Sequence, residues 1–329
     1  MTIPTNTLVT YGIGTAGGLA EQVSKAMANI DPQDTPFWSN LTKDTDNTQS
    51  RYCEWMIDSL AAVAANRQIE GDTLTAASVA QPARMGNYMQ ISSKIYNISR
   101  TVQQIKLHGR TKELMRTRLN KGKEIRRDIE VMLLSNIAQA SGSSISARIC
   151  AGLPTFLTNV VNASTIPTGD GTGLFASAAD TSLSYDHLVS AMQLAYEDGG
   201  SPTLCYVSPS LKRKFSALSI ATATPNTAQV RFNLTQGKSA ITAVGTVDIW
   251  MSDFGTIEFI PNRVQALDAG TTKMFFLIDP DRIGLAQLQP IEMFPLAKTS
   301  DGDQEYIVTE YTLKVSAPKA HGAGYGLTF

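Results

Sequence analysis

The sequence predicts an α+β fold that is organised around one long helix. Apolar residues recur at the helical period over residues 109–140, with charged residues on the other faces. Strand-like segments precede this helix in residues 49–105 and return after it in residues 283–329. Residues 183–282 carry shorter helices and buried strands, which indicates a compact region between the two sets of strands.

Composition limits the classes of protein that need to be considered. The chain has 329 residues, enough for two domains, and its 43% hydrophobic content excludes a disordered chain. A net charge of -1 argues against a protein that condenses nucleic acid by charge alone. The charged fraction of 17% is low against a typical value of about 25%, which indicates a surface that neighbouring subunits cover.

The three cysteines indicate reduced thiols. Cys53, Cys150 and Cys205 are odd in number and far apart, so they form neither a disulfide framework nor a zinc-binding pattern. The first ten residues lack the basic start and apolar stretch of a signal peptide. No apolar run approaches the roughly 18 residues of a membrane span. We therefore expect no contact with a membrane and synthesis in the cytoplasm.

Residues 1–48 are expected to form an extended arm. Only the stretch from Leu19 to Ile30 has apolar residues at helical spacing, so it predicts one short helix. Phe37 and Trp38 stand beside prolines that keep the backbone extended. An extended segment has no interior, so these two aromatic residues are expected to anchor the arm on this subunit or on another.

Residues 49–105 predict a long hairpin, with one strand from Arg51 to Leu60 and a second from Asn87 to Val102. An isolated hairpin is marginally stable in water, and its open edges favour pairing with other strands. We therefore expect a neighbouring subunit to cover it.

The long helix, taken as residues 109–140 and ended by Gly142, would span about 45 Å and act as a strut. Residues 141–182 are rich in loops. The compact region that follows predicts helices from Tyr185 to Tyr196 and from Pro209 to Leu218. Four strands are expected there: Leu204 to Val207, Ala243 to Met251, Thr256 to Ile260 and Met274 to Ile278. Two strands return at the end of the chain: Ile283 to Leu288 and Glu305 to Val315.

Several short motifs resemble the capsid proteins of tailed bacteriophages with the Hong Kong 97-like fold. In order along the chain they are Thr10-Tyr11, Ile30-Asp31-Pro32-Gln33-Asp34-Thr35-Pro36-Phe37, Glu54-Trp55, Asp58-Ser59-Leu60, Glu70-Gly71, Gly86-Asn87-Tyr88-Met89-Gln90-Ile91, Lys123-Glu124, Arg127-Asp128-Ile129-Glu130 and Lys319-Ala320-His321-Gly322. Each motif alone is weak, but their order covers nearly the whole chain.

The resemblance implies an amino-terminal arm (1–48), an extended hairpin loop (49–105), a peripheral domain with a spine helix (106–182), an axial domain (183–282) and return strands of the peripheral domain (283–329). It also implies pentamers and hexamers in an icosahedral shell around double-stranded DNA, with decoration, portal or scaffold proteins as further partners. The arm starts almost at once, so no scaffold segment is expected. The alternative within the same fold is an encapsulin, the shell of a bacterial compartment.

No arrangement for catalysis, cofactor binding or metal binding is found in the sequence. His108, His187 and His321 lie far apart, and there is no nucleophile motif, so an α/β enzyme is disfavoured. The cluster Gly169-Asp170-Gly171-Thr172-Gly173 lacks the ending of a phosphate-binding loop and is expected to be a surface loop. Asp279-Pro280-Asp281 is expected to be a turn rather than a metal site.

One basic run leaves two interpretations open. It either forms a solvated or intersubunit face, paired with nearby acids by helical spacing, or it meets packaged DNA by weak contacts. The candidate residues of this basic face are Arg110, Lys112, Arg116, Arg118, Lys121, Lys123, Arg126 and Arg127. Some shells of this fold cross-link a hairpin lysine to a neighbour's asparagine. Lys94 would be the corresponding lysine, but we do not expect that reaction here.

Overall fold

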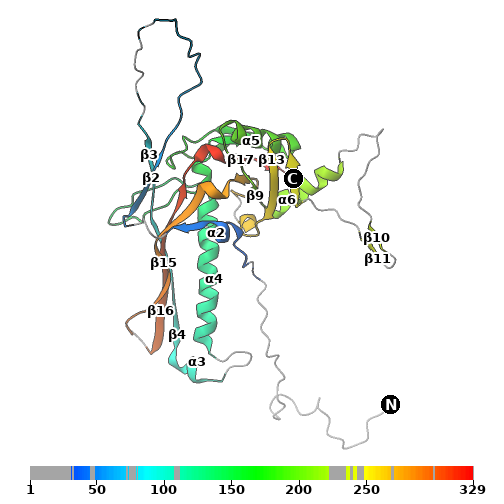
Figure 1. Ribbon diagram of the computed structural model, residues 1–329. Coiled ribbons are helices and arrows are strands. Elements are labelled where there is room, and N and C mark those ends of the chain that lie inside the picture. Colours follow the sequence, from blue (N-terminus) through cyan, green and yellow to red (C-terminus); the bar gives the residue numbers. More distant parts are fainter. Residues whose placement is uncertain are drawn as a thin grey trace, which may run out of the picture.

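A computed structural model describes residues 31, 33–44, 49–71, 73, 79, 81–106, 112–221, 235–237, 240–242, 248–267, 270–298 and 301–328. Figure 1 shows two parts joined along one helix: an elongated lower part of long strands beside α4, and a compact upper part with a second sheet. A narrow hairpin projects from the top. No helix in the described ranges is long and apolar enough to cross a membrane.

Helix α4 (Glu113–Leu134) is the expected long helix, but it is shorter than residues 109–140. Its 22 residues span about 33 Å. It ends at Ser135, which is extended, and not at Gly142. A Cβ at Gly152 would lie 1.8 Å from the carbonyl oxygen of Ser135, so a glycine is required where the following chain crosses the helix end. The expected helical position of Ile137 is therefore wrong.

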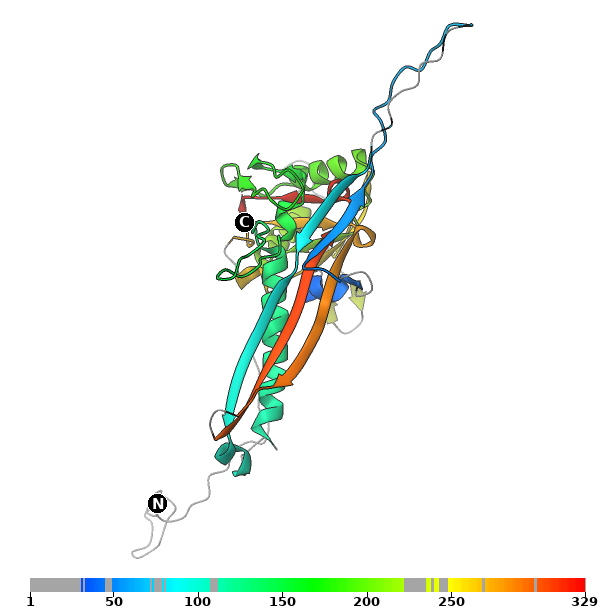
Figure 2. The ribbon, with the colours of Figure 1, turned by 90° about the vertical axis from the view of Figure 1, so that its left-hand side faces the viewer.

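A four-stranded sheet lies against α4, with three long strands running along the helix (Figure 2). Its order is β1 (Thr42–Asp44), β15 (Ile283–Pro295), β16 (Gly302–Val315) and β4 (Gln90–Ser99). β15 and β16 are antiparallel, and β16 pairs with β4 from Gly302 opposite Ser99 to Tyr311 opposite Gln90. β1 pairs parallel with β15, so the end of the arm joins the edge of this sheet.

The strand pairing of residues 49–105 differs from the expectation. β2 (Tyr52–Ile57) pairs with β3 (Ala83–Tyr88), and this short hairpin carries the projecting segment. The expected second strand, Asn87 to Val102, pairs with β2 only up to Tyr88. Its remainder forms β4 in the other sheet and then α3 (Arg100–Gln104). Burial alternates along β4, but its apolar residues lie on both faces, with Ile91 and Ile95 exposed and Tyr96 and Ile98 buried. The partner strand lies some 200 positions away in the chain.

The compact part is a six-stranded sheet covered by two helices, α5 (Tyr185–Glu197) and α6 (Pro209–Ala221). Both helices agree with the sequence prediction. The strand order is β12 (Ile249–Ser252), β13 (Gly255–Pro261), β9 (Leu204–Val207), β14 (Phe275–Ile278), β17 (Gly322–Gly324) and β5 (Asn159–Val161). The first and last of these strands along the chain, β5 and β17, come from outside residues 183–282. All four residues of β14 are buried, as expected for a strand in the middle of a sheet.

Short elements complete the described chain. They are α2 (Pro36–Asn40), η2 (Leu153–Thr155), β6 (Ala163–Thr165), β7 (Ala176–Ser177), β8 (Thr181–Ser182), β10 (Thr235–Gly237), β11 (Ala240–Thr242), η3 (Gln265–Leu267), η4 (Pro280–Arg282), η5 (Pro318–Ala320) and β18 (Leu327–Thr328). The expected helix from Leu19 to Ile30 lies outside the described residues, and so do His108 and Arg110.

Helix α4 and both sheets contribute to one large apolar core. Ile125, Ile129 and Leu133 of α4 are buried against residues of β15 and β16. Met115 and Leu119 belong to the apolar pattern that predicted a helix over residues 109–140, but they are exposed, because the sheet contacts the side of the helix that carries Arg118. A second core lies between α5, α6 and the six-stranded sheet.

Candidate functional surfaces

The arm is fixed to α4 by one buried carboxylate. Glu130 is fully buried, and its Oε1 accepts a hydrogen bond of 2.9 Å from the backbone N–H of Phe37. Its Oε2 accepts one of 2.6 Å from the backbone N–H of Trp38. Asn262 donates a third, of 2.6 Å, from its side-chain amide. Burial raises the pKa of Glu130, and these three hydrogen bonds oppose that rise.

The two expected arm anchors occupy different environments. Phe37 is fully buried and packs edge-on against Tyr206 of β9, with ring centroids 5.2 Å apart. Trp38 is half-buried, with the ammonium of Lys43 4.0 Å from its ring centroid and the guanidinium of Arg126 5.2 Å away. Asn40 donates a hydrogen bond to the Tyr206 hydroxyl. Helix α2 thus contacts both α4 and the six-stranded sheet.

Part of the basic run is paired within the subunit. Arg118 donates two hydrogen bonds to Glu305 of β16, one of them from Nε at 2.7 Å, and Tyr96 of β4 donates another at 2.5 Å. The hydrogen bonds from Arg118 lower the pKa of Glu305 despite its partial burial. Lys121 bonds Glu124 one turn along the helix, and Arg116 bonds Glu113. These contacts tie α4 to the sheet or to itself.

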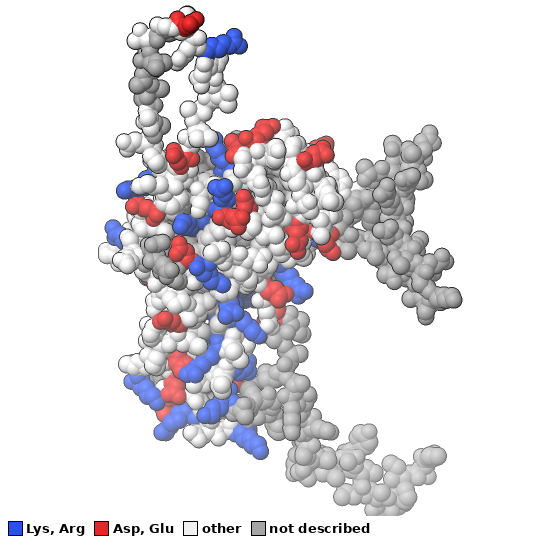
Figure 3. All heavy atoms as spheres, viewed as in Figure 1, with Lys and Arg blue, Asp and Glu red and all other residues white. Residues whose placement is uncertain are grey.

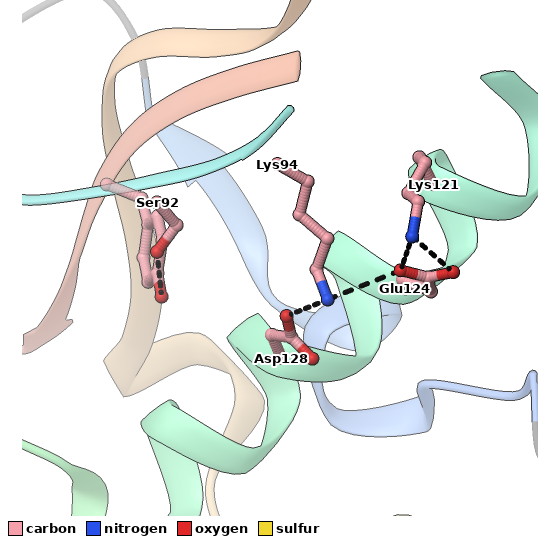
Figure 4. Close-up of polar contacts among 6 residues, drawn as sticks. Ser92, Lys94, Lys121, Glu124 and Asp128 are labelled. Atoms are coloured by element: carbon pink, nitrogen blue, oxygen red, sulfur yellow. Dashed lines mark hydrogen bonds and ion pairs between the residues drawn. The ribbon is translucent and has the colours of Figure 1, made fainter. Parts of the chain in front are cut away.

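Lys94 of β4 points at α4 and joins the same network (Figure 4). Its ammonium lies 2.6 Å from a carboxylate oxygen of Asp128 and 3.4 Å from one of Glu124. Burial alone would lower the pKa of Lys94, but hydrogen bonding and the charge of Asp128 and Glu124 raise it. This geometry gives Lys94 a role in joining β4 to α4.

The remaining basic residues lie on the side of α4 that faces away from the sheet. Lys112, Lys123 and Arg127 form no ion pair with any described residue, and Lys112 and Lys123 are exposed. Figure 3 shows blue side chains gathered over the lower part of the molecule, where α4 runs. Of the described residues of the basic run, Arg116, Arg118 and Lys121 are therefore paired inside the subunit, and Arg126 lies over the ring of Trp38. Lys112, Lys123 and Arg127 are open to partners, and we call these three the open half of the basic face.

The titratable residues that could suggest catalysis have structural contacts instead. His187 accepts a hydrogen bond from the backbone N–H of Ser184 at the start of α5. His321 is fully buried and accepts one from the backbone N–H of Asp279. Burial raises the pKa of the Cys150 thiol to about 12. Among the described residues, no group of three or more His, Cys, Asp or Glu side chains is placed to hold a metal ion.

The turn expected at Asp279-Pro280-Asp281 is present, but the glycine cluster expected as a surface loop is partly buried, because Gly169 and Gly171 pack against Phe156. Asp170 accepts hydrogen bonds from Thr168 and from the backbone and side chain of Thr172, and Gly169 and Gly171 have positive φ. Asp279 accepts a hydrogen bond from the backbone N–H of Asp281 and so begins η4. Both carboxylates therefore accept hydrogen bonds from residues of their own loops.

Comparison with known proteins identifies the family. Residues 3–328 match the family model described as SU10 major capsid protein. The chain belongs to the SU10 major capsid protein family. A curated major capsid protein from Escherichia phage Phieco32 is 36% identical over 111 residues, which is 33% of this chain and 31% of that protein. The match thus spans about a third of the length of the curated relative.

Solved capsid structures have the same fold. The cyanophage A-1(L) capsid protein superposes with a TM-score of 0.64 at 12% identity, over 98% of this chain and 100% of that one. The capsid protein of the native GTA particle gives 0.63 at 11% identity, again over 98% and 100%. The expected Hong Kong 97-like α+β fold is therefore confirmed. As a phage capsid protein, this chain is a structural component of the virion.

Sequence reasoning missed two residues that organise this capsid protein. From the sequence, Glu130 is predicted to be a charged residue on an exposed face of the helix, and Glu305 a charged residue in one of the returning strands. The only sequence feature that could have indicated burial of Glu130 is its position directly after Ile129, near the end of the helix, where apolar residues are most frequent. No feature of the sequence pairs Arg118 with Glu305, which is 187 residues away.

Proposed function

We propose that this capsid protein assembles as pentamers and hexamers into a closed icosahedral shell around the double-stranded DNA of a tailed phage. The observation that carries the proposal is a subunit with a capsid fold and a projecting segment whose described apolar residues are exposed to solvent. Decoration, portal or scaffold proteins would be further partners of the shell. A structural shell needs no cofactor, and we propose none.

The described residues of the projecting segment, 58–71, 73, 79, 81 and 82, support assembly most directly. Leu60 is 99% exposed, and Val63, Ile69 and Val79 are similarly open to solvent. Burying such side chains is favourable by about 1.5–3 kcal/mol each. Within one subunit the hairpin base, β2 and β3, leaves these residues without contacts. A neighbouring subunit that covers them would gain that free energy at every contact around the shell.

The two sheets suggest how the domains are divided. We assign the four-stranded sheet with α4 to the peripheral domain, and the six-stranded sheet with α5 and α6 to the axial domain around the symmetry axes. The proposed ranges 106–182, 183–282 and 283–329 then follow the chain, with β5 and β17 crossing into the axial sheet. The arm, 1–48, and the hairpin loop, within 49–105, make the contacts between subunits.

The open half of the basic face is proposed to meet the packaged DNA. Lys112, Lys123 and Arg127 carry charges that no described acid neutralises, and they lie on one side of α4. Phosphate contacts of this kind are independent of base sequence and weaken with salt. Three cations per subunit, repeated over a shell, suffice for weak contact without condensing DNA. An acidic surface of a neighbouring subunit is the alternative partner, and DNA content distinguishes the two.

Electron microscopy of the purified full chain tests the assembly. We expect closed shells or ring-shaped capsomers from the wild type. The double variant Val63→Asp, Ile69→Asp should give folded subunits that do not assemble, because each added charge would be buried at the contact. Ile145→Asp is the matched control, since Ile145 is 97% exposed outside the hairpin. Monomeric wild-type protein, or normal shells from the double variant, would contradict the proposal.

The contents of the particles separate a phage shell from a bacterial compartment. Particles purified from infected cells should contain nuclease-protected double-stranded DNA. Particles that enclose protein cargo and no DNA would instead identify an encapsulin.

A further inference from the structure

The strand that returns from the projecting hairpin changes its partner inside the motif Gly86-Asn87-Tyr88-Met89-Gln90-Ile91. Up to Tyr88 this strand is β3, which pairs with β2, and from Gln90 onward it is β4, which pairs with β16. Met89, at the change, is fully buried, and its backbone N–H donates a hydrogen bond of 2.9 Å to the carbonyl oxygen of Arg51. The direction in which the hairpin leaves the body is therefore set by the few residues on either side of Met89.

Asn87 fixes one side of this point through its side-chain amide. Its Oδ1 accepts a hydrogen bond of 2.9 Å from the backbone N–H of Ala151. Its Nδ2 donates one of 3.0 Å to the carbonyl oxygen of Leu313 in β16 and a longer one, of 3.4 Å, to that of Ala151. Asn87 is fully buried, and a buried amide that is bonded through both its oxygen and its nitrogen favours a single arrangement of the groups around it.

Gln90 fixes the other side to the neighbouring residue of the same loop. Its Oε1 accepts a hydrogen bond of 3.2 Å from the backbone N–H of Cys150. The loop is held in turn at the end of α4, because the backbone N–H of Gly152 donates a 3.0 Å hydrogen bond to the carbonyl oxygen of Ile137. Two amides, at the third and fifth positions of the motif, therefore connect the base of the hairpin to the chain that follows α4.

The hairpin is long, so its direction decides where its far end lies (Figure 2). Residues 58–71 are 14 residues that leave from the end of β2, and at ~3.3 Å per residue they can reach at most about 46 Å. Over that length a rotation of ~10° at the base moves the far end by up to about 8 Å, whereas apolar side chains are in contact only within about 4.5 Å. A small error at the base would therefore separate the exposed apolar residues from any surface that they fit.

We propose that Asn87 and Gln90 are positioning residues of the projecting hairpin. They hold its base in one orientation relative to the end of α4 and so direct its exposed apolar residues toward a neighbouring subunit. The role in assembly rests on the proposed function, whereas the fixed orientation does not. The chemistry requires an amide at residue 87, because a carboxylate of the same shape cannot donate to the Leu313 carbonyl oxygen.

Asn87→Asp tests the proposal, since it removes the donor and keeps the size of the side chain. The matched control is Asn136→Asp. Asn136 also bonds both backbone groups of one residue, accepting from the N–H of Phe175 at 3.3 Å and donating to its carbonyl oxygen at 3.0 Å. Phe175 belongs to neither the hairpin nor β16. Both variants lose the same kind of hydrogen bond, so a general loss of stability would affect both.

The orientation is measured in the full chain as the distance between two spin labels, by double electron–electron resonance. One label is attached at Met56→Cys, a position 70% exposed in β2, and the other at Leu119→Cys, 68% exposed in α4. Every sample carries Cys53→Ala, and the other native cysteines, Cys150 and Cys205, are fully buried. Labelled chain is diluted with an excess of unlabelled chain, so that distances within one chain are measured whether or not shells form.

We expect one narrow distance distribution for the labelled parent chain and for Asn136→Asp, and a shifted or broadened one for Asn87→Asp. Gln90→Met keeps the length of the side chain but removes the acceptor for the Cys150 N–H, so it should change the distribution in the same way but less. If Asn87→Asp does not fold, Gln90→Met decides alone. A distribution unchanged from the parent, or an equal change in Asn136→Asp, would overturn the proposal.

The yield of closed shells tests the role in assembly separately. Electron microscopy should show fewer closed shells from Asn87→Asp than from Asn136→Asp, and equal yields would overturn that role. Failure of the parent chain to form shells would contradict the proposed function. The distance measurement would still decide whether the two amides position the hairpin.

Discussion

The carboxylate of Glu130 accepts a 2.9 Å hydrogen bond from the backbone N–H of Phe37, across 93 residues of chain. This bond joins the arm to α4 at a point where Asn262, from the loop after β13, also reaches the same carboxylate. One side chain therefore connects the arm, the long helix and the six-stranded sheet. Movement of any one of these parts would break hydrogen bonds to a buried charge.

Replacing Glu130 by alanine should release the arm. The change leaves the backbone N–H groups of Phe37 and Trp38 and the amide of Asn262 without their acceptor, and each unsatisfied buried donor costs about 1–3 kcal/mol. We expect a clear fall in the urea midpoint of unfolding and faster proteolysis near residue 35. Glu197→Ala, an exposed position on α5, is the control. A Glu130→Ala protein as stable as this control would contradict the role assigned to the carboxylate.

Phe37 and Trp38 should differ in their contribution to stability. Phe37 is fully buried against Tyr206, so Phe37→Ala should cost about 3–5 kcal/mol. Trp38 is half-buried between two cations, so Trp38→Ala should cost less, on the order of 1–2 kcal/mol. Denaturant unfolding of both variants measures the difference.

Deletion of residues 1–38 should prevent shell closure. Normal closed shells from the deletion variant would show that the arm is dispensable.

The sequence predicted the elements of this fold better than it predicted their partners. Periodicity located α4, α5 and α6, because a helix buries one face regardless of what covers it. It could not show that β4 pairs with β16, since alternation indicates which face is buried but not the neighbouring strand. The end of α4 at Ser135 depends on the close approach of Gly152, a contact that only the folded chain creates.

The two halves of the basic face should respond differently to substitution. Replacing Lys112, Lys123 and Arg127 with glutamine should leave subunit stability unchanged and lower the DNA content of filled particles. Replacing Arg118 with glutamine should instead destabilise the subunit by about 1–3 kcal/mol, because the largely buried carboxylate of Glu305 loses its charged partner and keeps only the hydrogen bond from Tyr96. Thermal unfolding and the DNA-to-protein ratio of particles measure the two effects. Equal packaging by the triple variant would leave these three cations as a solvated or intersubunit face.

Acidification should destabilise the subunit through His321. Burial lowers the pKa of this imidazole from 6.5 to about 4, so the folded chain keeps it neutral where the unfolded chain would protonate it. The unfolded state therefore binds more protons below pH 6.5, and stability falls as the pH drops from about 6.5 to about 4. The full loss approaches about 3 kcal/mol, at ~1.36 kcal/mol per pH unit. His321→Asn keeps an acceptor for the Asp279 N–H but cannot titrate, so its unfolding free energy should be less dependent on pH over that interval. Parallel urea titrations at pH 7, 6 and 5 measure this, and identical pH profiles for the two proteins would show that His321 is not the group responsible.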